Sequence, residues 1–333
     1  MSTSGHIAFT ICSNNYLGQA NALKRSLLQH NGDFKFVIVV MDRPSDQIDY
    51  SEFQPAQLLF IEDIKDVPIQ ELIGRFDIIE LNTSVKPTVF KYLIKQHPET
   101  QRIYYLDPDL YFYGSLSELN GVLETSSTVL TPHIVNPIPR DGKLPEENTF
   151  LNFGIYNLGF CGMNPGHSET PKILDWWEER TLYHGFRNTS KGYFVDQLWM
   201  AQAPLFFDHV YVTKAFGYNM APWNLHERRI LEHTDDGILL NDGSTLVFYH
   251  FSKLADNEED VSREYDRYVL SDFPMLAGLY KEYRQVLKEV KFDAYRQIPV
   301  GFNLSSWRDS GSKRSSFKKF FRRIGKSLIR MTE

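Results

Sequence analysis

The sequence predicts an α/β protein with a doubly wound, mainly parallel sheet, and two observations lead to this prediction. Short apolar runs alternate with amphipathic helical segments through the first half of the chain, as in successive βαβ units. The apolar runs are also nearly continuous, as in FKFVIVVM at 34–41, which is typical of strands buried on both faces. In such a sheet ligands bind beyond the carboxyl ends of the strands, so residues directly after strands are the first functional candidates.

The expected elements alternate in chain order. In the first half we expect helices from about Leu17 and at 86–95, and strands at 6–13, 34–41, 57–61 and 102–106. Apolar residues at 20, 23, 27 and 28 give the first helix one face for packing. In the second half we expect strands at 128–131, 155–162 and 246–250, and helices at 170–182, 192–203 and 263–290. The long proline-rich loop before 155 is of a kind that is either functional or disordered.

Composition places the chain among globular proteins of a reducing compartment. Its 333 residues can bury a large core, and 42% hydrophobic with 23% charged residues is ordinary for such a protein. The two cysteines, Cys12 and Cys161, each lie inside an apolar run, which argues against a disulfide scaffold. We see neither a secretory signal nor an apolar stretch of the roughly 18 residues that span a bilayer. We therefore expect a cytoplasmic protein.

The end of the chain differs in charge from the rest. The formal net charge is −6, yet eight Lys or Arg and no acidic residue lie between Lys313 and Arg330. Apolar residues recur there at steps of three and four, which predicts a cationic amphipathic helix at a membrane surface. A helix docked on the protein itself and a nucleic-acid-binding tail are the alternatives, and the acidic remainder disfavours nucleic acid. We expect a main domain at 1–304 and a tail at 305–333, which holds the protein at the inner face of the membrane through 313–331.

The sharpest local signal is a strand that ends in two carboxylates. The run 102–106 is followed by Asp107, Pro108 and Asp109. Side chains at i and i+2 of an extended segment point to the same side, and two carboxylates so close repel each other unless a cation lies between them. A hard divalent cation there also accepts phosphate oxygens. An ordinary strand-end turn is the alternative, whereas a glycosidase pair requires carboxyl groups about 5 Å or more apart, usually from different elements.

This strand and Asp-x-Asp unit, about a hundred residues into a βαβ start, resembles the GT-A glycosyltransferases. It is most similar to the family-eight group that contains glycogenin and bacterial lipopolysaccharide galactosyltransferases. The resemblance covers roughly residues 6–255 and implies a GT-A (Rossmann-like nucleotide-sugar transferase) fold. It also implies a UDP-sugar or other nucleotide-sugar donor, a glycan or glycolipid acceptor, Mn²⁺ or Mg²⁺, and hexose transfer with retention. A non-catalytic nucleotide-sugar or glycan-binding protein of the same fold is the alternative function.

The resemblance extends to several donor-side positions. Asn14 and Tyr16, after the first strand, resemble the nucleotide-contacting loop of the family, and Lys86 resembles its basic donor-binding residue. Asn157-Leu-Gly159 resembles the Asn-Ala-Gly segment that borders the transferred sugar. From the residues alone, Lys86 can equally be a solvated charge at a helix start, and Asn157 with Gly159 can simply shape a tight turn. Asp107 is expected to contact both donor and metal.

The catalytic and third metal-binding positions come from the second half. Asp196-Gln197 resembles the Asp-Gln pair near the reacting anomeric carbon, although Leu198 replaces a following Asp of the family. Gln197 would stabilise the oxocarbenium-like centre of a retaining enzyme, whereas an inverting enzyme would need a base such as Asp196. Asp196 can also complement the dipole of the next helix. His250 stands where the family has a third metal ligand, and a nitrogen ligand favours Mn²⁺ over Mg²⁺; a structural histidine is the alternative.

Two further segments bear on the acceptor and on the end of the domain. The aromatic and amide-rich loop at 218–226 suits a sugar, which makes Trp223, Asn224 and His226 the candidate acceptor-binding residues, with a plainly packed loop as the alternative. The family's His-x-x-Gly-x-x-Lys-Pro-Trp ending is absent, because His250 is followed by Phe-Ser-Lys253. We find no Walker sequence, Gly-x-Gly-x-x-Gly, Cys-x-x-Cys or Gly-x-Ser-x-Gly motif in the chain.

Overall fold

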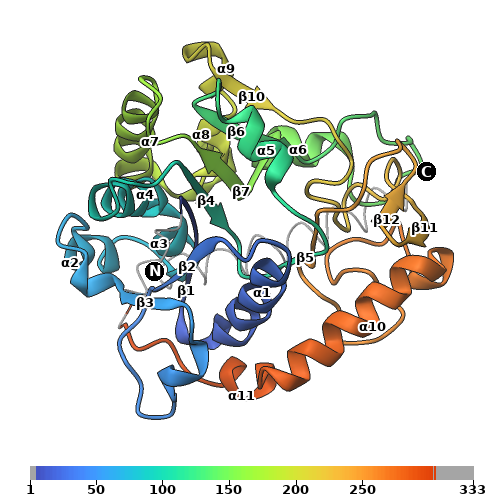
Figure 1. Cartoon of the computed structure of the whole chain (residues 1–333), viewed down its shortest axis with the longest axis horizontal. Helices are drawn as coiled ribbons and strands as arrows, with labels where there is room; N and C mark the ends of the chain where they lie inside the picture. The colour runs from blue at the N-terminus through green and yellow to red at the C-terminus, as the bar shows by residue number, and fades with distance from the viewer. Residues whose placement is uncertain (1–4, 303, 305–333) are drawn as a thin grey trace, which may run out of the picture.

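The computed structural model describes residues 5–302 and 304, and a seven-stranded sheet forms its centre (Figure 1). The strand order is β10-β6-β7-β4-β1-β2-β3. The strands are β1 His6–Cys12, β2 Phe34–Val40, β3 Gln57–Phe60, β4 Arg102–Leu106, β6 Thr128–Pro132, β7 Tyr156–Met163 and β10 Val210–Val212. Neighbours β4, β1, β2 and β3 pair in parallel, as predicted, but β7 runs antiparallel between β4 and β6. The start of β7 therefore meets the ends of β4 and β6 at one edge of the sheet.

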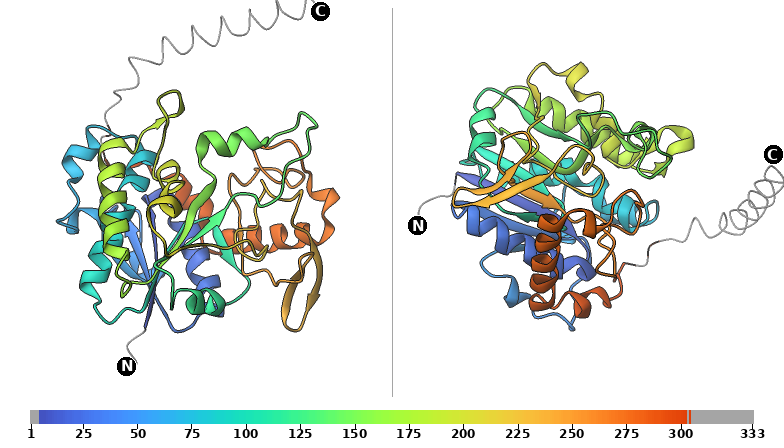
Figure 2. Two further views of the ribbon diagram at one scale, coloured as in Figure 1. Left: turned by 90° about the horizontal axis from the view of Figure 1, so that it is seen from above. Right: turned by 90° about the vertical axis from the view of Figure 1, so that its right-hand side faces the viewer.

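Helices cover both faces of this sheet (Figure 2, left). One face carries α2 Ile69–Ile73, α3 Ile78–Ser84, α4 Lys86–Gln96, α7 Thr170–His184, α8 Gln197–Met200 and α9 Ala203–Phe206; the other carries α1 Leu17–His30, α5 Ser117–Val122 and α11 Phe292–Arg296. Strand β1 shows why both faces are apolar. Ile7, Phe9 and Ile11 pack in the first core, whereas Ala8 and Cys12 pack in the second, because successive side chains of a strand point to opposite faces.

A smaller unit contains two separate two-stranded sheets. Strand β5 Leu110–Phe112 pairs antiparallel with β13 Phe248–His250, and β11 Ile230–Thr234 forms a hairpin with β12 Gly237–Leu240. Helix α10 Pro274–Glu289 packs on this unit through a third apolar cluster. In the β5–β13 pair His250 lies opposite Leu110, and Phe251 N–H donates to Asp109 C=O at 2.9 Å. This pairing carries His250 to the acidic turn, which lies more than a hundred residues earlier in the sequence.

Three expectations about the second half need correction. The helix expected at 192–203 is wrong, because Tyr193–Phe194 is strand β9, paired with β8 Arg187–Asn188, and only the short helices α8 and α9 follow. Within 263–290 the helix begins at Pro274, because the earlier residues are held by loop contacts such as those of Arg267 with the carbonyls of Lys143 and Pro145. The proline-rich loop contains a helix, α6 Glu147–Phe153.

The predicted tail cannot be compared with the structure, because 305–333 lies outside the described residues. Within the part that is described, no helix combines the length and apolar character needed to cross a membrane. Both cysteines are buried in strands and free, as expected.

Candidate active site

The two aspartates after β4 and the histidine at the end of β13 form one cluster. His250 Nε2 lies 3.0 Å from Asp109 Oδ1 and 3.9 Å from Asp107 Oδ2. Each of the three side chains offers one ligand atom, and these atoms all lie within 4.8 Å of one another. The structure thus brings together all three residues proposed from the sequence as metal ligands.

The ring of His250 is held from behind. Its Nδ1 lies 3.3 Å from Asn219 Oδ1, and the Trp223 ring meets it edge-on at 5.1 Å. When Nδ1–H donates to this amide oxygen, Nε2 keeps its lone pair toward the aspartates, which is the tautomer that a metal needs. Burial lowers the pKa of His250, but the adjacent Asp109 carboxylate outweighs burial and the net pKa is raised. Conversely, burial raises the pKa of Asp109 and His250 lowers it to a net decrease.

Gly159 allows three side chains of the site to approach its backbone closely. A Cβ atom at this position would lie 2.6 Å from His250 Cε1, 2.7 Å from Asp107 Oδ2 and 2.8 Å from Asn157 Oδ1. The backbone of Gly159 also accepts from Asp107 N–H at 2.7 Å, which fixes the acidic turn against β7. Two partly exposed carboxylates and one imidazole fit a divalent cation.

Lys86 forms a buried ion pair on the opposite side of Asp107. Its Nζ lies 2.8 Å from Asp196 Oδ2, 2.9 Å from Leu158 C=O and 4.0 Å from Asp107 Oδ1. The ammonium also sits over the Tyr105 ring, 4.1 Å from its centroid. Lys86 is only 2% exposed, so the interpretation of this residue as a solvated charge at a helix start is wrong. Burial raises the pKa of Asp196, and the Lys86 ammonium acts against that rise.

Val195, which has a strained backbone, directly precedes Asp196 and orients it toward Lys86. Val195 has a φ of +42°, which a β-branched residue rarely adopts, and such strain persists where the surrounding structure enforces it. Asp196 precedes α8 but its side chain makes no capping hydrogen bond, so the ion pair is its observed contact. The next residue, Gln197, accepts from Leu158 N–H at 3.1 Å and donates to Phe153 C=O at 2.8 Å. Asp196 and Gln197 therefore both face the start of β7.

Asn157 supplies a hydrogen-bond acceptor, its side-chain oxygen, beside Gly159. Its Nδ2 lies 3.3 Å from Nε2 of His133, a fully buried histidine whose pKa burial lowers to about 3. Among the described residues Asn157 Oδ1 is buried without a hydrogen-bond partner, and it lies close to the Gly159 backbone. Because His133 is neutral, its Nε2 can accept from the amide and thereby fix which end of Asn157 faces the site. His133 was not found from the sequence, and only its position just after strand β6 could have indicated it.

In the loop after β1, Asn14 has a structural role and Tyr16 is accessible. Asn14 is buried, donates to Arg43 C=O at 2.8 Å and accepts from Tyr50 Oη at 3.0 Å, so its side chain shapes the loop. Tyr16 is 45% exposed and lines a cavity of about 590 Å³ that reaches Asp109. Charged side chains of both signs that the sequence analysis did not assign also line this cavity: the cations Lys253, Arg263, Arg284, Lys288 and Arg296, and the acids Asp256, Glu258 and Asp293.

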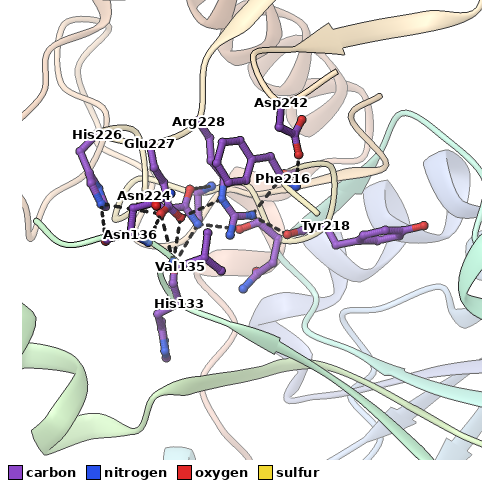
Figure 3. A network of polar contacts seen from close by, with 12 residues as sticks. His133, Val135, Asn136, Phe216, Tyr218, Asn224, His226, Glu227, Arg228 and Asp242 are labelled. Atoms are coloured by element: carbon purple, nitrogen blue, oxygen red, sulfur yellow. Dashed lines mark hydrogen bonds and ion pairs between the residues drawn. The ribbon is translucent and has the colours of Figure 1, made fainter. Parts of the chain in front are cut away.

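The loop predicted to bind the acceptor is tied to the segment after β6 (Figure 3). Both N–H groups of Asn224 are engaged, by His133 C=O at 3.0 Å and Asn219 C=O at 2.9 Å, and His226 Nε2 lies 3.0 Å from Asn136 C=O. The buried Trp223 ring contacts the rings of His133 and His250. The structure thus shows positioning roles for these residues, and their contact with an acceptor stays a prediction.

A buried ion pair anchors the same loop. Glu227 accepts from the backbone of Val135 and Asn136, and Arg228, 3.2 Å from Glu227, donates to Phe216 C=O and Tyr218 C=O (Figure 3). Because both charges are buried with their hydrogen bonds made, they lock the two loops together. The wall behind His250 is therefore preorganised.

The strand order, the reversed β7 and the carboxylate pair after β4 define the GT-A fold that the sequence predicted. The structure is similar to that of the bifunctional glycosyltransferase WbbM, with a TM-score of 0.50 and 13% identity, over 90% of this chain and 52% of that chain. It is also similar to the galactosyltransferase LgtC in complex with donor and acceptor sugar analogues, with a TM-score of 0.48 and 14% identity, over 91% of this chain and 99% of that chain.

The sequence comparisons give relatives rather than a family. No family model matches the chain. The uncharacterized protein YfnF of Bacillus subtilis (strain 168) is 27% identical over 281 residues, which are 82% of this chain and 89% of YfnF. The uncharacterized protein YfnD of the same organism is 21% identical over 249 residues, which are 73% of this chain and 76% of YfnD. Because both relatives are uncharacterized, they indicate no activity, and the function is argued from the site.

Proposed function

We propose that the protein is a metal-dependent glycosyltransferase that moves a hexose from a nucleoside-diphosphate sugar, a UDP-sugar, to a glycan or glycolipid hydroxyl with retention of configuration. The observation that carries the proposal is the convergence of Asp107, Asp109 and His250, beside a cavity that reaches Asp109 and is lined by cations and acids. Carboxylates together with cations around one opening suit a ligand that is bound both through a metal and through its own phosphates.

The cavity supports a nucleotide donor. Its volume of about 590 Å³ lies within the range of small-molecule sites, roughly 300–1,000 Å³. The exposed ring of Tyr16 offers a stacking face for the base, and Lys253 with Arg263 offers cations for the diphosphate. Asp107, Asp109 and His250 would hold Mn²⁺, or Mg²⁺, and the ion when bound would offset the charge that develops on the leaving diphosphate.

The sugar-binding side supports retention. An inverting enzyme needs an accessible base, but Asp196 is 1% exposed and its carboxylate is bound to Lys86. Gln197, partly exposed and fixed by Leu158 and Phe153, is suited to stabilise positive charge at the anomeric carbon with its amide oxygen. Asn157 Oδ1 is suited to accept from a sugar hydroxyl. Lys86 would support the donor through the carboxylates that it contacts.

The acceptor and the cellular location rest on the sequence. We place the acceptor near Trp223, Asn224 and His226, in the loop whose Trp223 ring contacts His250. The basic segment 313–331 supports association with an anionic membrane surface on its cytoplasmic side, and therefore a glycolipid acceptor. The acidic balance of the remaining chain speaks against nucleic acid as a partner.

The test is turnover of a panel of nucleotide sugars with Mn²⁺, comparing the wild type with Asp109→Asn. We expect one donor to be hydrolysed or transferred only with metal, and the variant to lose on the order of a thousandfold, about 4 kcal/mol of transition-state stabilisation. Asp175→Asn, an exposed carboxylate on α7, is the matched control and should keep full activity. Donor binding without turnover would make the protein a binding protein, and failure to bind any donor would refute the proposal.

A further inference from the structure

Helix α6 ends in a group of exposed apolar side chains. Leu151 is 70% exposed, Phe153 37% and Ile155 40%; we call these three residues the α6 tip. A single exposed apolar residue is ordinary, but three within five residues form a patch of the kind that marks an interaction site. The patch continues into a mostly apolar cavity of about 300 Å³, lined by Pro132, Ile134, Glu147, Phe150, Leu151, Ile155 and Tyr156.

The topology places the α6 tip at the edge of the sheet that carries the candidate site. Helix α6 connects the end of β6 with the start of β7, and β7 is antiparallel to both β6 and β4. Both ends of this connection therefore lie at the edge where β4 ends at Asp107. In the left view of Figure 2 the green helix α6 lies at the upper end of the sheet, opposite the N-terminus. Phe153 C=O holds Gln197 directly, at 2.8 Å.

The described chain ends at the same edge. Gly301 N–H donates to Asp42 Oδ1 at 2.7 Å, and the buried Asp42 lies just past the carboxyl end of β2. In the sheet β2 is three strands from β7, which corresponds to about 14 Å at roughly 4.8 Å per strand. Strand β4, with the acidic pair at its end, lies between them. The α6 tip and the end of the described chain therefore flank the candidate site.

We propose that the α6 tip inserts into an anionic lipid bilayer and thereby holds the mouth of the candidate site against the membrane surface. The tail supplies charge complementarity, with eight cations and no acid at 313–330. The exposed acids Glu146 and Glu147 lie at the start of α6, Glu147 also lines the cavity beside the tip, and Arg140 and Lys143 precede them. That this contact delivers a lipid-linked acceptor rests on the proposed function; the contact itself does not.

The two contacts predict different responses to salt. Attraction of the tail to anionic lipid weakens steeply at about 0.5 M salt, where screening acts over a few Å. Insertion of apolar side chains does not depend on charge and persists. The full chain should therefore keep a salt-resistant fraction of its membrane binding, and that fraction should belong to α6.

The experiment is sedimentation of the full chain with vesicles of equimolar phosphatidylcholine and phosphatidylglycerol, at low and high salt, without donor or acceptor. The double variant Leu151→Ser, Ile155→Ser should bind about tenfold more weakly at high salt. The matched control is Leu205→Ser, which removes an 81% exposed leucine from α9, the helix before the amino end of β10. The control should bind as the wild type does.

Two outcomes would overturn the proposal: vesicle binding of the α6 variant equal to that of the wild type, or an equal loss in the Leu205→Ser control. Both variants replace exposed side chains, and an unchanged melting temperature checks that they fold. A failure of this inference is distinguishable from a failure of the proposed function, because vesicle binding is measured without turnover. Donor hydrolysis by the α6 variant should stay at the wild-type level.

Discussion

The candidate site has two halves, an acidic half with Asp107, Asp109 and His250 and a neutral half with His133, Asn157 and Gln197. Each half contains a buried histidine that contacts Trp223, yet their electrostatics differ. His133 and His250 meet the tryptophan ring at 5.2 and 5.1 Å. Burial lowers the pKa of His133 to about 3, whereas at His250 the neighbouring Asp109 overcomes burial and raises the pKa. Equal burial thus gives opposite protonation behaviour because the neighbours differ. One half is an acidic cluster suited to a cation, and the other is a neutral set of amides suited to hydroxyl groups.

The largest expected effect comes from adding a side chain at Gly159, where the two halves meet. Gly159→Ala adds a Cβ atom that would lie within 2.8 Å of His250, Asp107 and Asn157, so the substitution should distort both halves together. We expect metal-dependent turnover to fall on the order of a thousandfold, about 4 kcal/mol. Steady-state kinetics and Mn²⁺ titration measure this change.

A matched glycine substitution separates local crowding from loss of flexibility. A Cβ atom at Gly121, in α5, would meet no atom within 4 Å. Gly121→Ala should leave turnover unchanged and stabilise the protein slightly, by up to about 1 kcal/mol. Normal metal binding and turnover in Gly159→Ala would show that the absence of a side chain at this position is not needed.

The next largest effect is expected at the buried pair behind the acidic half. Lys86→Met leaves the Asp196 carboxylate buried without its cation, and breaking a buried ion pair in this way costs about 3–5 kcal/mol. Chemical denaturation measures the free energy of unfolding. The double variant Lys86→Met, Asp196→Asn should recover most of that loss, because the stranded charge is gone. A single variant as stable as the wild type would contradict the pairing.

Metal should stabilise the folded protein through the acidic half and not through the neutral half. Mn²⁺ at about a hundred times its dissociation constant should raise the free energy of unfolding by about 2.7 kcal/mol if it binds only the folded state. Thermal unfolding with Mn²⁺ and with a chelator measures this difference. Asp109→Asn should abolish the stabilisation and His133→Gln should keep it. An equal response of both variants would remove the distinction between the two halves.

A smaller effect is expected in the neutral half on acidification. Because the pKa of His133 is about 3 in the folded protein and near 6.5 when unfolded, the unfolded chain binds an extra proton between these values. Stability should therefore fall with decreasing pH, by about 2 kcal/mol between roughly pH 6.5 and 5. His133→Gln should remove this part of the pH dependence, which urea unfolding at two pH values measures. Parallel pH profiles for the wild type and the variant would refute the neutral state of the buried ring.

The two acids of the acidic half could be predicted from sequence because their signals are local, whereas His250 was predicted from the family resemblance. The strand 102–106 and the acids after it lie in one short run, and the end of an apolar strand predicts where side chains converge. The neutral half depends on long-range pairing, since His133, Asn157 and Gln197 meet only after β7 reverses direction. The apolar spacing at 192–203 matched a helix, but the positive φ of Val195 interrupts it. Periodicity alone does not reveal such a turn.

The reversed strand also bears on how such a protein diversifies. Because β7 runs against β6, the segment 133–155 leaves and re-enters the sheet at one edge and needs no crossover on either face. Residues can be added to or removed from this connection without changing the register in which the strands pair. The parallel strands β1 and β4 lack that freedom, since their connections must traverse a packed helical layer. One wall of the site is thus open to change in length, while the wall with the acidic pair changes only by substitution.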